Sequence, residues 1–292
     1  MKRIVISTSS SCLNYINTPH AVRFVPFHII INGKDHIDLK DTNTAHLSQL
    51  LIEYPNLSVK TSPPTEQEIS QLFEELYAEG YEEVLVCTIS SAISQSHQIF
   101  DTLKARYVGR MNIFVYDTKT LNIDEGVLAF EADFMMQEGK PMLEIIARLD
   151  EIRKNSLFMF TLSDLHHLIR SKKLSASAGF FASLLGIKPV MWVSDDGRVV
   201  PREKIRKIER SINYMADTAM TYVGNKDAFI YMADTTLGLY TDILQELLSD
   251  AYGIRNTPVI PVSTVSLANH GPDGIGLGVY RGKLPKLVKY LK

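Results

Sequence analysis

The stretch EEVLVCTISSAISQS, Glu82–Ser96, carries the pattern from which the fold can be read. Its apolar, β-branched part, Val84–Cys87, predicts a buried strand. A turn rich in hydroxyl groups follows, with Ser90, Ser91 and Ser94 close together in the sequence. A helix is expected next, because apolar residues recur near the helical repeat at Ile93, Phe100, Leu103 and Tyr107. Free backbone N–H groups, a helix dipole and hydroxyl donors would then converge at the end of this strand, where we expect an anion site.

The rest of the chain also alternates apolar strands with amphipathic helices, which is typical of an α/β protein. Asn32-Gly33 predicts a hairpin, and the spacing of Thr65 and Glu68 predicts a capping box at the start of a helix that ends at Gly80. Further strands are expected at Arg3–Ser7, Val22–Ile31, Met111–Tyr116, Leu157–Thr161, Ile187–Val193, Ala228–Met232 and, as the last strand, Val259–Ser263. Further helices are expected at 125–137, at 141–154, after Ser163, between Ser175 and Gly186, from about Glu203 and from about Thr236.

This alternation predicts two domains that join near residue 155. Residues 1–155 form a mostly parallel sheet flanked by helices, and residues 156–292 form a second α/β domain. A formal net charge of −2 gives no basic excess that would attract nucleic acid or an anionic membrane. Cys12 and Cys87 lie in or beside apolar strands, so we expect buried thiols in a reducing cytoplasm. No apolar run predicts a signal peptide or stable membrane insertion.

Three polar segments are candidate binding sites. The first is the serine turn, although serine is also a common helix cap. The second is the turn Lys60–Pro64 with Thr61 and Ser62, which is also an ordinary loop before a helix. The third is His270 in a segment rich in glycine and proline, although most single histidines are structural. Because ligands of α/β sheets bind beyond the carboxyl ends of the strands, we expect Thr61 and Ser94 to face one crevice.

A basic cluster is a fourth candidate, either as a solvated face or as a site for a polyphosphate or an acidic partner. It comprises Arg170, Lys172 and Lys173, with Arg202 and Arg206 further along the chain. Common catalytic motifs are absent: the chain has no G-x-S-x-G elbow, no P-loop and no H-E-x-x-H. His166 and His167 are adjacent and would point to different sides of a helix, so we predict no metal site and no catalytic residues.

Seven segments in this order resemble the DegV family, the fatty-acid-binding proteins that serve bacterial fatty acid kinase (FakB-like proteins). The segments are VISTSSSCL, VPFHIIINGKDHID, KTSPPT, CTISSAISQS, VYDTKT, LHHLIRSKKLSASAGFFASLLGIKPV and HGPDGIGLG. The resemblance extends over nearly the whole chain. The resemblance implies a two-domain DegV-like α/β fold with one long-chain fatty acid buried in a tunnel. It implies no cofactor besides this ligand.

The resemblance also assigns roles to residues of this chain. The acyl carboxylate is expected on Thr61, with Ser62 in the same turn, on Ser94 or alternatively Ser91, and on His270. The protein is not expected to be an enzyme. It would present the fatty acid to an ATP-dependent fatty acid kinase, which makes an acyl phosphate, and the basic cluster would dock this kinase. Apolar runs that would line the tunnel, or else belong to the ordinary core, supply Phe27, Ile29, Phe158, Phe160, Phe180 and Leu184.

The chain departs from the family pattern at several positions. Ala92 and Gln95 stand where the family has glycines, and Thr8 stands where it has an aspartate. The family's histidine commonly lies one residue further from the Gly-Pro pair than His270 does, and the placement of charge in the basic segment also differs. Two other functions stay open: an acyl-transfer hydrolase with Ser94 as nucleophile and His270 as base, and a carrier of another amphipathic acid.

Overall fold

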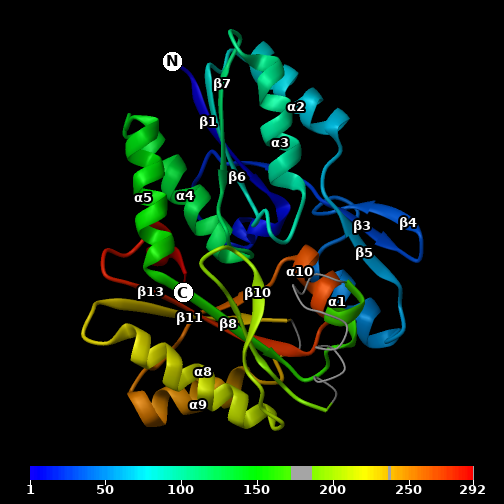
Figure 1. The fold of residues 1–292 in the computed structure, drawn as a ribbon, viewed down its shortest axis with the longest axis vertical. Helices are drawn as coiled ribbons and strands as arrows, with labels where there is room; N and C mark the ends of the chain where they lie inside the picture. The colour runs from blue at the N-terminus through cyan, green and yellow to red at the C-terminus, as the bar shows by residue number, and fades with distance from the viewer. Residues whose placement is uncertain (172–185, 236–237, 292) are drawn as a thin grey trace.

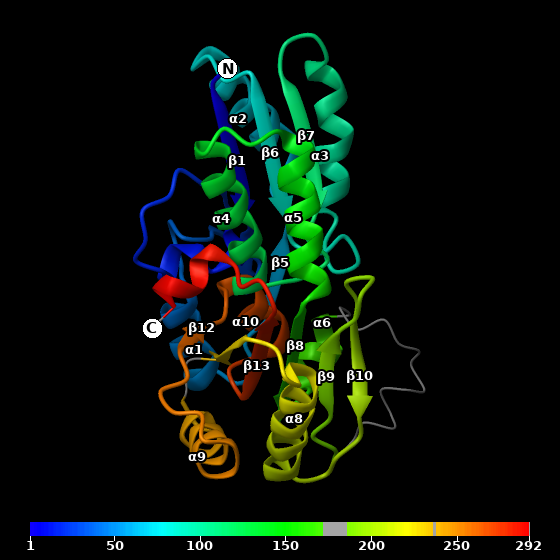
Figure 2. The same ribbon diagram turned by 90° about the vertical axis from the view of Figure 1, so that its left-hand side faces the viewer.

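The computed structural model describes residues 1–171, 186–235 and 238–291, and arranges them as three sheets with helices packed on their faces (Figures 1 and 2). The first sheet has four strands in the order β2-β1-β6-β7, and all three pairings are parallel. It confirms the predicted parallel sheet. Its strands are β1 (Arg3–Thr8), β2 (Arg23–Val25), β6 (Glu83–Thr88) and β7 (Asn112–Asp117).

Helices cover both faces of this sheet, with α2 and α3 on one side and α4 and α5 on the other (Figure 1). Apolar side chains of α2 and α3, including Phe73 and Phe100, are fully buried against the strands. The predicted capping box at Thr65 and Glu68 is present at the start of α2. The helices are α2 (Glu66–Ala78), α3 (Ser96–Lys104), α4 (Ile123–Gln137) and α5 (Met142–Lys154).

The second sheet has six strands in the order β10-β9-β8-β13-β11-β12. Only β11 and β12 pair in parallel among its described strands. Helices α8 and α9 pack on its outer face (Figures 1 and 2), where Ile212, Met215 and Leu248 are fully buried. The elements are β8 (Ser156–Leu162), β9 (Val190–Val193), β10 (Val199–Glu203), β11 (Ala228–Asp234), β12 (Val259–Pro261), β13 (Gly274–Arg281), α8 (Ile208–Val223) and α9 (Thr241–Tyr252).

The third sheet, β4-β3-β5, is antiparallel and lies beside the first. The predicted hairpin at Asn32-Gly33 joins its strands β3 and β4, and both residues have positive φ. The remaining helices pack near this sheet and near the inner face of the second sheet. These elements are β3 (His28–Ile31), β4 (Lys34–Ile37), β5 (Val59–Ser62), α1 (Thr44–Glu53), α6 (His166–Ser171) and α10 (Thr264–His270). Short 3₁₀ turns occupy Ser9–Ser11, Leu13–Tyr15, Ala105–Tyr107 and Lys286–Tyr290.

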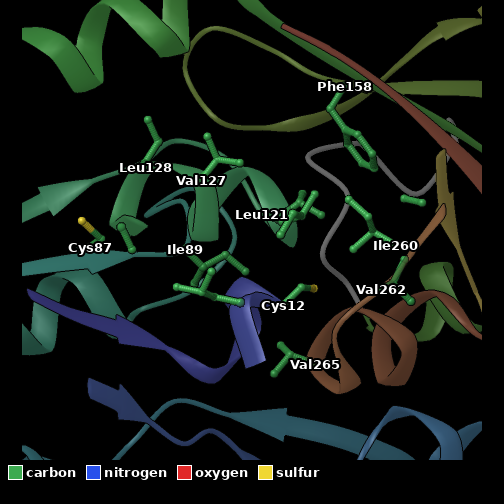
Figure 3. Packing of buried hydrophobic residues seen from close by; sticks show 14 of the residues in the cluster. Cys12, Cys87, Ile89, Leu121, Val127, Leu128, Phe158, Ile260, Val262 and Val265 are labelled. Carbon is green, nitrogen blue, oxygen red and sulfur yellow. The ribbon is translucent and has the colours of Figure 1, made fainter. Parts of the chain in front are cut away.

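The largest cluster of buried apolar residues lies where these layers meet. Figure 3 shows part of it: Val127 and Leu128 of α4 lie near Cys12, Cys87 and Ile89, and Phe158 and Val265 belong to the same cluster. Cys12 and Cys87 are buried free thiols, as predicted. Residues from both halves of the chain therefore share one core.

Strand β13 was not predicted, and Val259–Ser263 was wrongly expected to be the last strand. In β13 the glycines Gly274, Gly276 and Gly278 alternate with apolar residues, and the strand pairs with β8 and β11. A Cβ at Gly276 would lie 2.8 Å from Cζ of Phe158, and one at Gly278 would overlap the ring of Tyr231. Glycine is therefore needed because aromatic rings cover this face of the strand.

Other boundaries also differ from the predictions. The run Val22–Ile31 is divided between two sheets, as β2 and β3, because Pro26 cannot donate to a strand ladder. Helix α3 begins at Ser96, so Ile93 lies in the preceding turn. Glu203 ends β10 instead of starting a helix, and α8 begins at Ile208. Residue Ser263 caps α10, a helix that the sequence did not predict.

The proposed division near residue 155 falls between α5, which ends at Lys154, and β8, which begins at Ser156. Strands of the first and third sheets come from before this point, and all strands of the second sheet come from after it. No helix in the described part of the chain is long and apolar enough to span a membrane.

We expect Gly278→Ala to lower the free energy of unfolding by about 2–3 kcal/mol, because the new methyl group would overlap the Tyr231 ring. Urea unfolding measures this loss. In a Tyr231→Leu background, where the ring is absent, the same substitution should cost much less. An equal cost in both backgrounds would contradict the packing of β13 against this ring.

Candidate functional site

The two polar segments that carry Thr61 and Ser94 do border one crevice, but the prediction of a turn at Lys60–Pro64 was wrong for Thr61 and Ser62, which pair with β3 as part of strand β5. Thr61 and Ser62, at the end of β5, lie across from Ser91 and Ser94, which belong to the turn between β6 and α3. Together they border a cleft of about 450 Å³, here called the hydroxyl cleft. Its described lining residues are Phe27, Thr61, Ser62, Pro63, Ser91, Ala92, Ile93, Ser94 and Gln95.

Ser90 holds the serine turn in shape. Its carbonyl accepts hydrogen bonds from the N–H groups of Ile93 and Ser94, and its Oγ accepts one from Ala92 N at 3.2 Å. The same Oγ donates to the carbonyl of Gly197 at 2.8 Å, which ties the turn to the β9–β10 hairpin. Ser90 is therefore a structural residue of the turn.

The four serine and threonine hydroxyl groups of the cleft fall into two pairs: one pair donates its protons to protein acceptors, and the other accepts hydrogen bonds from protein N–H groups. Ser91 Oγ donates to Asp117 Oδ2 at 2.5 Å, and Ser62 Oγ donates to Pro63 O at 3.3 Å. Ser94 Oγ instead accepts from Ser96 N at 3.2 Å, and Thr61 Oγ1 accepts from Asn269 Nδ2 at 3.3 Å. Because a hydroxyl group has one proton, Thr61 and Ser94 keep theirs available for a ligand in the cleft.

Asn269 is a site residue that the sequence argument missed. Its Nδ2 donates to Val265 O at 2.6 Å within α10 and to Thr61 Oγ1, so it both anchors to its helix and orients the threonine. A signal was present, because Asn269 immediately precedes His270. It also stands where the resembled family commonly has its histidine, one residue further from the Gly-Pro pair.

His270 lies at the end of α10 and lines a second cavity instead of the hydroxyl cleft. Its Nδ1 lies 2.7 Å from the carbonyl oxygen of Gly271, so this nitrogen carries a proton and donates it. Burial, with a smaller effect of nearby His167, lowers the pKa of His270 to about 4, against the opposing effect of the hydrogen bond to Gly271 O. The imidazole is therefore neutral near pH 7, with Nε2 as an acceptor.

The second cavity, here called the apolar cavity, has a volume of about 60 Å³ and adjoins the hydroxyl cleft through Ile93, which lines both. Of the residues predicted to line a tunnel, Phe158 and Phe160 line the apolar cavity and Phe27 lines the hydroxyl cleft. Ile29 is fully buried in the core and lines neither. The predicted tunnel residues Phe180 and Leu184 lie outside the described residues.

The described members of the basic cluster, Arg170, Arg202 and Arg206, are exposed. Arg170 lies in the last turn of α6 and donates to Leu57 O and to His167 Nδ1, both at 3.1 Å. The guanidinium of Arg202 lies over the ring of Trp192, 4.4 Å from its centroid. Lys172 and Lys173 lie outside the described residues.

The arrangement does not resemble a nucleophilic catalytic site. No hydrogen bond joins Ser94 to His270 in the described structure, and His270 Nδ1 is oriented by a backbone carbonyl where a catalytic triad has a carboxylate. No group of His, Cys, Asp or Glu side chains among the described residues has the geometry of a metal site.

Two buried acids of α4 were also missed by the sequence argument. Glu125 accepts hydrogen bonds from Ser7 Oγ, from Thr8 N and Oγ1, and from Ser10 Oγ, at 2.6–3.1 Å. Asp124 accepts from the hydroxyl groups of Tyr231 and Tyr280. Burial raises the pKa of Asp124 to about 6 and that of Glu125 to about 7, against the opposing effect of these donors.

Known proteins resemble the chain over nearly its full length. A family model described as an uncharacterised protein of the DegV family matches residues 2–282. A DegV domain-containing protein of Clostridium acetobutylicum is 27% identical over 281 residues, which cover 94% of this chain and 96% of that protein. A DegV domain-containing protein of Listeria innocua is 29% identical over 207 residues, covering 71% of this chain and 72% of that protein.

Solved structures share the fold. A fatty acid binding DegV family protein from Streptococcus agalactiae superposes with a TM-score of 0.87 at 24% identity, covering 97% of this chain and all of that chain (100%). DegV from Bacillus subtilis, described as a fatty acid binding protein, gives 0.81 at 22% identity, with 96% and 99% covered. A stearic acid-binding protein from Eubacterium ventriosum gives 0.82 at 21% identity, with 96% and 98% covered.

We expect the free energy of unfolding to fall as the pH rises from about 4.5 to about 7, because folded Glu125 binds its proton more tightly than the unfolded chain does. A rise from the usual 4.5 to about 7 corresponds to about 3 kcal/mol lost across this range. Glu125→Gln should remove this contribution, which urea unfolding at several pH values measures. The exposed control Glu138→Gln should keep the wild-type profile; a Glu125→Gln profile equal to that of wild type would contradict the assignment.

Proposed function

The chain belongs to the DegV family, and we propose that it binds one long-chain fatty acid and presents it to an ATP-dependent fatty acid kinase. The carboxylate would lie in the hydroxyl cleft and the acyl chain in the apolar cavity. Support for the ligand comes from the structural neighbours described as binding fatty acids. Support for its position comes from the chain's own geometry.

The observation that carries the proposal is the pair of available protons on Thr61 and Ser94. Each hydroxyl oxygen is oriented by an N–H donor, from Asn269 and from Ser96, so each O–H is free to donate to a carboxylate between them. Helix α3 begins at Ser96, and its positive end adds a favourable field for an anion. The substitutions at Ala92 and Gln95 leave this geometry possible, because neither residue has a positive φ.

The cleft holds the carboxylate without a fixed positive charge. None of its described lining residues is Lys, Arg or His. Hydrogen bonds from neutral hydroxyls orient a carboxylate but stabilise its charge less than an arginine pair would. The carboxylate oxygen therefore stays reactive toward the γ-phosphate of ATP on the kinase, which suits a protein that presents its ligand and leaves the chemistry to a partner.

The apolar cavity would supply the affinity. Burial of each methylene contributes about 0.8 kcal/mol, so a chain of about sixteen carbons offers on the order of 10 kcal/mol. A cavity of about 60 Å³ accommodates only a few water-sized groups, so the walls must separate to admit a long chain. Part of the burial energy is then spent on that separation. His270 lines this cavity as a neutral group, which avoids a buried charge beside the acyl chain.

The kinase would dock on the exposed arginines of the basic cluster. Arg170 contacts Leu57, which precedes β5, and the far end of β5 carries Thr61. This places one of the arginines a single strand away from the hydroxyl cleft. Arg202 precedes Glu203, which pairs with Val190 of β9, and Val190 pairs with Thr161 near the end of β8. Helix α6, which carries Arg170, follows β8 in the chain.

We expect wild-type protein to release one long-chain fatty acid in denaturing mass spectrometry, and Thr61→Val and Ser94→Ala to hold less of it or to support slower phosphorylation by the kinase. Loss of one donor to a charged group should weaken the interaction about tenfold. Ser62→Ala is the matched control, because its proton already bonds to Pro63 O in the same cleft. Wild-type protein without a fatty acid would refute the carrier function, whereas wild-type behaviour of both variants would refute only the carboxylate site.

We expect Arg202→Glu combined with Arg206→Glu to abolish phosphorylation of the bound lipid without releasing it, because reversed charges repel an acidic partner surface. Phosphorylation assays and native mass spectrometry separate the two effects. The control combines Lys226→Glu with Lys283→Glu, two exposed lysines near the opposite end of the second sheet. Unchanged turnover by the arginine variant, or equal loss in the control, would reject this docking face.

A further inference from the structure

A row of aromatic rings crosses the inner face of the second sheet. Phe160 stacks near Phe158 with centroids 6.1 Å apart, Phe158 near Tyr231 at 6.3 Å, and Tyr231 near Tyr280 at 5.9 Å. The row begins beside His270, whose ring lies 6.4 Å from that of Phe160. It ends at the buried carboxylate of Asp124, to which both tyrosine hydroxyls donate. The row thus runs from His270, which follows the Asn269 that contacts Thr61, to a buried acid.

Phe158 has little freedom within this row. Its ring lies between two neighbouring rings and above Gly276, where a Cβ would be 2.8 Å from Cζ of Phe158. The side chain is buried, with 6% of the residue exposed. The glycine therefore sets the depth at which the ring lies against the sheet.

Phe158 separates two cavities of opposite character. On one side it lines the apolar cavity, and on the other it lines a polar cavity of about 240 Å³. Among the described residues that line the apolar cavity, none is Lys, Arg, Asp or Glu. The polar cavity is lined by Lys119, Thr120, Asp124, Arg153, Lys154, Ser156, Phe158, Val193, Ser194 and Asp195.

We propose that Phe158 sets the maximum length of the acyl chain that this protein accepts, with the terminal methyl group stopping against its ring. The inference rests on the proposed function, because it requires the carboxylate in the hydroxyl cleft and the chain in the apolar cavity. A chain that passed the ring would enter the polar cavity. There it would gain little from burial and would displace water from charged groups, which is unfavourable.

Removal of the ring should join the two cavities and lengthen the apolar path. In Phe158→Ala, the end of a longer fatty acid can occupy the space left by the ring, so its additional methylene groups are buried there. Each such methylene should raise the affinity of a longer acid, relative to a shorter one, about fourfold. Shorter acids should bind with little change, because their chains end before Phe158.

The experiment is a competition among saturated fatty acids. Delipidated protein is incubated with an equimolar mixture of even-numbered acids of about 12 to 22 carbons, and the bound fraction is identified by denaturing mass spectrometry. We expect the distribution for Phe158→Ala to shift toward longer acids, and Phe158→Leu, which keeps more of the core filled, to shift in the same direction by less. Phe130→Ala is the control for the loss of a buried phenylalanine, because Phe130 lies in α4, packs near Tyr290 and lines neither cavity.

The possible results separate the proposed fatty acid binding from the role of Phe158 in chain length. Wild-type protein that binds no acid from the mixture would overturn the proposed function itself. Wild-type protein that binds acids, with the same chain-length distribution as Phe158→Leu and Phe158→Ala, would overturn only the role of Phe158. A shift in Phe130→Ala equal to that in Phe158→Ala would also overturn it, because the effect would then follow from general loosening of the core.

Discussion

The three alternating glycines on the inner face of β13, Gly274, Gly276 and Gly278, are the constraint on which the interior of this protein depends. Gly276 and Gly278 let the rings of Phe158 and Tyr231 lie directly against the backbone of a central strand. The rings form a wall of the apolar cavity and, through Tyr231, reach the buried acid Asp124. A side chain at either glycine would displace this wall toward α4 and the main core. The glycines of β13 thus allow rings from β8 and β11 to form this wall.

In the hydroxyl cleft, the directions of the existing hydrogen bonds decide which hydroxyl groups can donate to a ligand. Four hydroxyl groups border it, but two of their protons are already donated, one to Asp117 and one to Pro63 O. The other two hydroxyls accept from nitrogen donors and are thereby oriented as donors themselves. A neutral cleft with two oriented protons binds a carboxylate with modest electrostatic stabilisation. The adjoining apolar cavity supplies affinity in its place, so recognition of the head group and retention of the chain are divided between neighbouring sites.

Much of the fold could be predicted because the signals were local. The run Val84–Cys87 has the composition of a buried parallel strand, and the spacing of Thr65 and Glu68 identifies a helix start whatever surrounds it. Strand β13 escaped prediction because its alternating glycines are read as a loop. These glycines suit a strand because aromatic rings pack directly against them. The rings come from β8, over a hundred residues away in the sequence, and from β11, about fifty residues away. Similarly, Ile93 has the spacing of a helix residue, but Ser90 closes a turn there first.

The sequence alone determined the α/β class, the parallel first sheet and the hydroxyl-rich segments, because these follow from residue type and short-range spacing. The hydroxyl groups meet between two sheets, since Thr61 lies in β5 of the third sheet and Ser94 follows β6 of the first. Tertiary structure decided which hydroxyls remain donors, that Asn269 orients Thr61, and that His270 faces the apolar cavity. It also decided that Phe158 separates an apolar space from a charged one. These outcomes depend on bond direction and on side chains from distant strands, and neither is encoded in the spacing of any single segment.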